Sequence, residues 1–299
     1  MSRTCLAAWV VGCMLVSGEF AHAQADKCFV SNGVRIRYVE RGTGEPVVLG
    51  HGFNGSLELG WIDTGVFAEL AKNYRVIAFD QRGHGKSDKP RDTTAYGHQM
   101  ALDIVRLMDH LEITRAHIVG YSMGANLVAK LLTLHPERFI TATLGGESGR
   151  PPMTAAQLEE MEQNALEYEQ EIPFRSTILR TWPTNEPPPT EAQLREASRE
   201  RVGRGNDLLA FAAGIRAIPD EVVTPGQMAA VRVPVLGIAG SLDSRLAGLK
   251  RLQAILPNMR LVIIEGAVHA TADPRSAPRR PEFLAAVRAF LAEHPLRTN

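Results

Sequence analysis

Ser122 lies between two glycines in the stretch GYSMG, which spans residues 120–124. The β-prone residues HIV precede this stretch, and the helix-forming residues ANLVAKLL follow it. A strand, a sharp turn and a helix are the context in which the pattern G-x-S-x-G carries meaning, because glycines permit a turn tight enough to expose the serine hydroxyl. The chemistry that this pattern predicts is nucleophilic attack by Ser122. A small residue in a glycine-flanked turn is the alternative.

A serine hydroxyl attacks only with the help of a base, and that base needs an acid to orient it. His269 follows the last apolar segment, RLVIIEG, and Asp243 follows the earlier apolar segment VPVLGIAG. The chain order Ser122, Asp243, His269 is the order known for one triad-bearing fold. Glu147 follows a third apolar segment, FITATLGG, and stays open as the alternative acid.

Short apolar segments that alternate with helical patterns must position these side chains. The segments PVVLGHG, YRVIAFD, AHIVGYS, FITATLGG, VPVLGIAG and RLVIIEG contain few polar residues, as do strands covered on both faces. Helical patterns separate them, so we expect an α/β fold with a mostly parallel sheet. Asn32-Gly33 joins two β-prone stretches before the first of these segments and predicts an antiparallel hairpin.

The alternation stops after Glu147 and resumes near residue 227. Polar helical stretches and the proline-rich WPTNEPPP fill the interval. We therefore expect an inserted helical lid at residues 148–226 and a core formed by residues 24–147 and 227–299. An insertion that follows a sheet strand lies over the strand ends, where open α/β sheets bind ligands.

Five stretches in this order, HGFNGS, DQRGHGKSDKP, GYSMGA, GSLDS and GAVHA, resemble the α/β-hydrolase superfamily in its lidded, esterase-like branch. The resemblance implies that Ser122 is the nucleophile, Asp243 the orienting acid and His269 the base. It also implies an oxyanion hole formed by the backbone N–H groups of Phe53 and Met123. It calls for no cofactor and no metal.

Two other histidine-bearing stretches compete for a role. His51 precedes the expected oxyanion loop, where a structural role is favoured over that of a base. The stretch DQRGHGKSD contains Asp80, Arg82 and His84, and a metal site there would require more than one histidine. In the family this stretch is a turn that supports the floor of the site.

The first 23 residues are typical of a secretory signal peptide. Arg3 precedes an apolar run from Cys5 to Val16, and the run is followed by Ala21-His22-Ala23, a small-x-small cleavage site. Acylation at Cys13, as in a bacterial lipoprotein, is the less favoured alternative. Either reading predicts export, and cleavage after Ala23 leaves Cys28 without a cysteine to pair with.

Composition excludes several function classes. The chain has 299 residues with 33 basic and 33 acidic side chains, and this balance argues against a nucleic-acid partner. No apolar run after the leader is long enough to span a bilayer.

Taken together, the motifs and the leader predict a secreted or periplasmic serine hydrolase that cleaves small carboxylic esters through an acyl-enzyme. One alternative is C–C hydrolase, lactonase or amidase chemistry on the same residues. The other is a non-catalytic ligand-binding protein. The sequence leaves the oligomeric state open.

Overall fold

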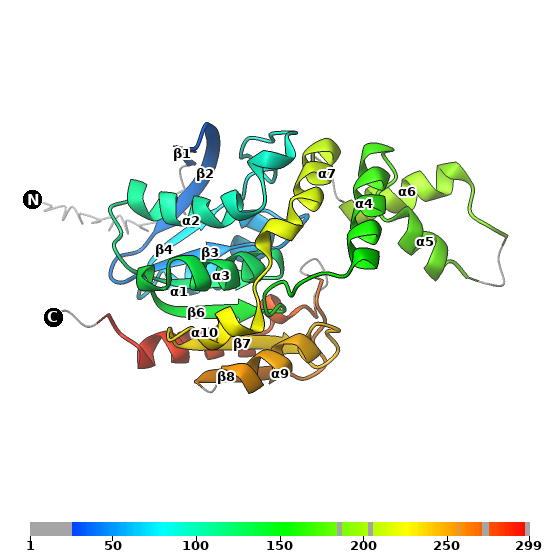
Figure 1. The fold of residues 1–299 in the computed structure, drawn as a ribbon. Coiled ribbons are helices and arrows are strands. Elements are labelled where there is room, and N and C mark those ends of the chain that lie inside the picture. The colour runs from blue at the N-terminus through cyan, green and yellow to red at the C-terminus, as the bar shows by residue number, and fades with distance from the viewer. Residues whose placement is uncertain (1–25, 184–186, 203–205, 257, 271–274, 297–299) are drawn as a thin grey trace, which may run out of the picture.

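An eight-stranded β-sheet forms the centre of the molecule in the computed structural model, which describes residues 26–183, 187–202, 206–256, 258–270 and 275–296. Its strand order is β1-β2-β4-β3-β5-β6-β7-β8 (Figure 1). The strands are β1 Lys27–Ser31, β2 Val34–Arg41, β3 Pro46–Gly50, β4 Arg75–Phe79, β5 Ala116–Tyr121, β6 Phe139–Gly145, β7 Val235–Gly240 and β8 Met259–Ile264. The expected signal peptide, residues 1–23, lies outside the described residues.

Antiparallel pairing is limited to the N-terminal side of the sheet. β1 pairs with β2 and β2 with β4 in antiparallel fashion, whereas all the pairs from β4 to β8 are parallel. Asn32 and Gly33 connect β1 to β2 with φ angles of 48° and 80°, the left-handed backbone that a two-residue hairpin turn needs. The predicted α/β fold, mostly parallel with an antiparallel N-terminal hairpin, is confirmed.

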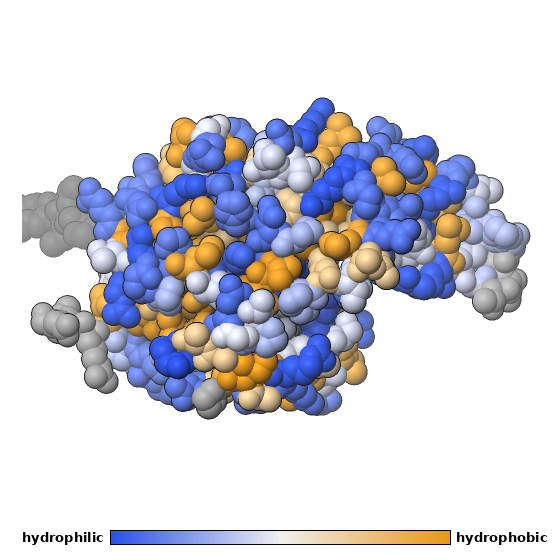
Figure 2. All heavy atoms as spheres, viewed as in Figure 1, coloured by the Kyte–Doolittle hydropathy of each residue, from blue (hydrophilic) through white to orange (hydrophobic). Residues whose placement is uncertain are grey.

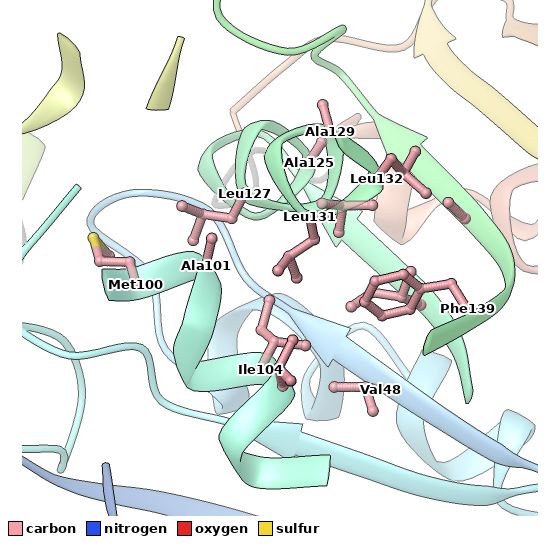
Figure 3. Packing of buried hydrophobic residues seen from close by; sticks show 14 of the residues in the cluster. Val48, Met100, Ala101, Ile104, Ala125, Leu127, Ala129, Leu131, Leu132 and Phe139 are labelled. Atoms are coloured by element: carbon pink, nitrogen blue, oxygen red, sulfur yellow. The ribbon is translucent and has the colours of Figure 1, made fainter. Parts of the chain in front are cut away.

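Neighbouring strand residues point to opposite faces of a sheet, and helices cover both faces of this one. Val48 packs in the cluster beneath α2, α3, α8 and α9, whereas Val47 packs in the cluster beneath α1 and α10. Figure 3 shows Ala101 and Ile104 of α2 facing Leu127 and Leu131 of α3, with Val48 and Phe139 beside them. These helices are α1 Val66–Leu70, α2 His98–His110, α3 Met123–Leu134, α8 Pro225–Ala229, α9 Leu246–Ile255 and α10 Pro281–Glu293.

Four further helices lie between β6 and β7 in the chain: α4 Ala155–Glu169, α5 Arg175–Thr181, α6 Glu191–Val202 and α7 Leu208–Arg216. α7 lies between the sheet and α4, and α5 and α6 project away from the core (Figure 1). Hydrophilic residues cover most of this projection on the face seen in Figure 2. Within the described ranges no helix is both long and apolar enough to cross a membrane.

Candidate active site

Ser122 occupies a sharp turn between β5 and α3. Its φ and ψ angles are 53° and −116°, a backbone conformation that costs a residue with a side chain about 1–3 kcal/mol. Both flanking glycines are required here. A Cβ on Gly120 would lie 2.4 Å from the carbonyl oxygen of Gly124, and one on Gly124 would lie 2.2 Å from that of Gly50. The packed turn therefore maintains the strained serine and leaves its hydroxyl at the carboxyl end of the sheet.

The structure brings Ser122, His269 and Asp243 into one hydrogen-bonded chain. Ser122 Oγ lies 2.9 Å from His269 Nε2, and His269 Nδ1 lies 2.8 Å from Asp243 Oδ2. A carboxylate only accepts, so Nδ1 carries the imidazole proton and Nε2 is free to accept the hydroxyl proton. The Asp243 side chain is fully buried, and its other oxygen accepts the Arg245 N–H at 2.8 Å. Asp243 is thereby fixed facing His269.

Glu147, the alternative acid, has a different partner. Its Oε1 lies 3.1 Å from Arg245 Nη1, and none of its hydrogen bonds within the described residues reaches His269. Gly146, which precedes Glu147, packs against the other two side chains, since a Cβ there would lie 3.1 Å from His269 Nδ1 and 3.4 Å from Asp243 Oδ2. Of the two acids, the structure therefore places Asp243 on the histidine.

Two backbone N–H groups lie near Ser122 without acceptors among the described residues. Met123 is the first residue of α3, where the N–H groups of a helix are unpaired and the helix dipole favours negative charge. Phe53 follows Gly52, and a Cβ on Gly52 would lie only 3.2 Å from Ser122 Cβ. The geometry is compatible with the predicted oxyanion hole.

His51 holds the loop that carries Phe53. Its Nε2 accepts the Gln81 N–H at 3.1 Å, so its Nδ1 carries the proton and donates to the Gly52 carbonyl oxygen at 2.8 Å. The ring is completely buried, and this burial lowers the pKa of His51. A buried neutral histidine with both nitrogens engaged has a structural position and no free nitrogen to act as a base.

The stretch DQRGHGKSD forms a turn beneath the site. The carboxylate of Asp80 accepts the backbone N–H groups of Leu57 and Lys86, each at 2.8 Å, and the Arg37 guanidinium at 2.9 Å. Arg82 forms a buried ion pair with Asp103 of α2. These bonds connect the turn to the neighbouring loop, strand and helix, as expected of a supporting element.

Tyr121 is a residue of the site that the sequence patterns did not reveal. Its hydroxyl donates to the backbone carbonyl of His269 at 2.7 Å, and the two rings lie 5.5 Å apart. Tyr121 is the last residue of β5 and immediately precedes Ser122, so one element positions both Ser122 and the histidine loop. The variable position before the serine in G-x-S-x-G gives no signal for this contact.

Two cavities meet at Ser122 and Phe53. One of about 230 Å³ extends toward α7 and is lined by Phe211 and Ile215 of that helix; we call it the α7 cavity. The other, of about 270 Å³, is lined by His269 and by α6 residues including Val202; we call it the His269 cavity. A substrate whose carbonyl lies at Ser122 therefore has a separate space for each of the two groups attached to that carbonyl.

The inserted helices contribute aromatic side chains to this region. The Phe53 ring lies 4.7 Å from the ring of Phe211 and 6.1 Å from that of Tyr168. Among the apolar residues of the inserted helices, Tyr168 and Phe174 line the α7 cavity. Others do not: Met161 and Ile178 pack between helices, and Leu158 and Leu179 are exposed.

The comparisons with known proteins agree with this fold. Residues 45–172 match the family model described as alpha/beta hydrolase fold. The 2-hydroxy-6-oxononadienedioate/2-hydroxy-6-oxononatrienedioate hydrolase of Burkholderia vietnamiensis is 30% identical over 70% of this chain and 75% of its own length. The chain belongs to the α/β-hydrolase family, a family of hydrolytic enzymes.

Two further similarities cover different shares of the chain. The enol-lactonase from Burkholderia xenovorans has a structure that matches with a TM-score of 0.70 and 25% identity, over 89% of this chain and all of that one. The dihydrolipoyllysine-residue acetyltransferase component of the acetoin cleaving system from Cupriavidus necator is 38% identical over 43% of this chain. That match spans only 33% of the relative's length. The chain likewise covers less than half of the length of other curated relatives that it matches.

Proposed function

We propose that the protein is a serine hydrolase that cleaves carboxylic esters through an acyl-enzyme, without a cofactor. The observation that carries this proposal is the hydrogen-bonded chain from Ser122 Oγ through His269 to the buried Asp243 carboxylate. A serine with a merely structural role needs neither an imidazole acceptor nor a carboxylate behind it. The non-catalytic alternative, a ligand-binding protein, has no use for this arrangement.

The geometry supports a two-step reaction. His269 Nε2 takes the Ser122 hydroxyl proton as Oγ attacks the ester carbonyl, and the N–H groups of Met123 and Phe53 stabilise the oxyanion. The C–O bond to the alcohol then breaks, and the alkoxide takes the proton from His269. Water repeats the sequence on the acyl-enzyme, releases the carboxylic acid and restores the serine.

The proton transfer also assigns the two cavities. The departing alcohol must lie where His269 can protonate it, and of the two cavities only the His269 cavity is lined by this residue. The alcohol therefore occupies the His269 cavity and the acyl group the α7 cavity. Phe53, Met100, Phe211 and Ile215 give the α7 cavity apolar walls that suit a small acyl chain.

A substrate panel tests which bond is cleaved. We expect the protein to hydrolyse p-nitrophenyl esters, with kcat/KM highest for short to medium acyl chains because the α7 cavity is small. The panel should contain, beside these esters, a lactone, an anilide and a vinylogous 1,5-diketone for C–C cleavage, each assayed for kcat/KM. A non-ester substrate that exceeds every ester by tenfold or more would replace ester hydrolysis as the function.

We also propose that the protein is exported, on the basis of Arg3, the apolar run and the Ala21-His22-Ala23 site. Mass spectrometry of the protein isolated from its native host is expected to find Gln24 as the first residue. A chain that starts at Met1 or Ser2 would contradict export through a cleaved signal. A diacylated Cys13 at the N-terminus would show the lipoprotein alternative instead.

A further inference from the structure

The α7 cavity contains a buried amide without a hydrogen-bond partner. Asn126 lines the cavity, its side chain is only 2% exposed, and its Oδ1 has no partner among the described residues. No bond from its Nδ2 reaches a described residue either. Burying an amide without partners costs stability, so such a group calls for an explanation. The amide is available to a ligand that enters the cavity.

The position of Asn126 relates it directly to the nucleophile. It lies in the first turn of α3, its backbone N–H donates to the Ser122 carbonyl oxygen at 3.1 Å, and both residues line the α7 cavity. The walls of the cavity include apolar and aromatic side chains such as Tyr96, Met100 and Ile218. A short acyl chain that starts at Ser122 can therefore bring a polar substituent to Asn126.

The charges that line the α7 cavity are already paired. Arg150 Nε lies 3.0 Å from the buried Glu221 carboxylate, and Arg245 Nη1 lies 3.1 Å from Glu147. His84 adds no charge, because burial lowers its pKa to about 3. Each cation among the described lining residues thus has a carboxylate partner. A carboxylate on the substrate would face two carboxylates of the protein as well as two guanidinium groups.

Resting on the proposed function, we propose that the α7 cavity selects acyl groups that carry an uncharged hydrogen-bonding substituent, a hydroxyl in the simplest case, and that Asn126 is the residue that recognises it. The amide offers both a donor and an acceptor, so it matches a hydroxyl group in either role. Recognition of this kind discriminates strongly, because the analogue without the hydroxyl leaves the amide unpaired.

Three methyl esters test this selectivity. Methyl 6-hydroxyhexanoate and methyl heptanoate differ only by a terminal hydroxyl in place of a methyl group, and monomethyl adipate carries a carboxylate there. In the unmodified enzyme we expect the hydroxy ester to have the highest kcat/KM of the three. In Asn126→Leu, the ratio of kcat/KM for the hydroxy ester to that for methyl heptanoate is expected to fall by about tenfold.

Asn73→Leu provides the control. Asn73 is exposed and lines neither the α7 cavity nor the His269 cavity, so its replacement is expected to leave the ratio unchanged. Thermal unfolding separates recognition from a structural role. Removing an unpaired buried amide is expected to leave the Tm of Asn126→Leu unchanged or higher, whereas loss of a structural hydrogen bond would lower it.

The same contact is measured without turnover in the Ser122→Ala background. Calorimetric Kd values for the hydroxy ester and methyl heptanoate should show the same dependence on Asn126. An unchanged ratio in Asn126→Leu, or a preference for monomethyl adipate, overturns the inference while ester hydrolysis stands. Absence of hydrolysis of every ester, with an Asn126-dependent Kd ratio intact, overturns the proposed function and leaves the recognition of the hydroxyl in place.

Discussion

Replacing Ser122 with alanine is expected to reduce kcat on the best ester by about 10⁶-fold, to the residual level that binding and the oxyanion hole provide. The reason is that, among the residues that the structure describes, Ser122 supplies the hydroxyl that hydrogen-bonds to His269 Nε2, at 2.9 Å. In the unmodified protein a fluorophosphonate should add once, and peptide mass spectrometry should place the adduct on Ser122. The Ser122→Ala protein should not be labelled.

Ser148→Ala is the matched control for this experiment. Ser148 follows β6 near the same edge of the sheet and is half-buried, but within the described residues it forms no hydrogen bond to a histidine. Its replacement is expected to preserve both labelling and turnover. Near-normal turnover in Ser122→Ala on the best ester would refute the serine-hydrolase proposal and favour the ligand-binding alternative.

Asp243→Asn is expected to lower kcat by up to about 10⁴-fold, whereas Glu147→Gln should cost far less. An amide at position 243 can present its NH₂ group to His269 Nδ1 and so stabilise the tautomer in which Nε2 carries the proton. That tautomer cannot accept the hydroxyl proton of Ser122. Glu147 instead contacts the half-exposed Arg245, so its neutralisation leaves the histidine unaffected.

The measurement is kcat for both variants on one ester, at a pH where the unmodified enzyme is fully active. Circular dichroism should show that Asp243→Asn keeps the fold, because the Asn side chain occupies the same buried space. A larger loss in Glu147→Gln than in Asp243→Asn would assign the orienting role to Glu147.

The order of the apolar segments was enough to predict the sheet and the proximity of the three site residues. Ser122, Asp243 and His269 each follow a strand, and the carboxyl ends of parallel strands meet at one edge of a sheet. Tight packing explains why the glycines around Ser122 were informative, since a side chain at either would overlap backbone atoms. The catalytic roles of these residues stay predictions until the variants are measured.

Other features of the site could not be predicted because they depend on how the insertion packs. Composition indicated helices between β6 and β7, but it did not show that α7 would lie against Phe53. The division into two cavities follows from that packing. Similarly, Asn126 follows the serine motif as an ordinary helix residue, and only the three-dimensional surroundings show that its amide is buried without a partner.

The aromatic contacts of Phe53 have a consequence for redesign of this enzyme. The backbone of Phe53 belongs to the core, whereas its ring rests on Phe211 of α7 and Tyr168 of α4. The inserted helices therefore do not form an independent cover that can be exchanged at will. Grafting the insertion of another α/β-hydrolase onto this core would alter the support of Phe53, the proposed oxyanion donor, so we expect substrate range and turnover to change together.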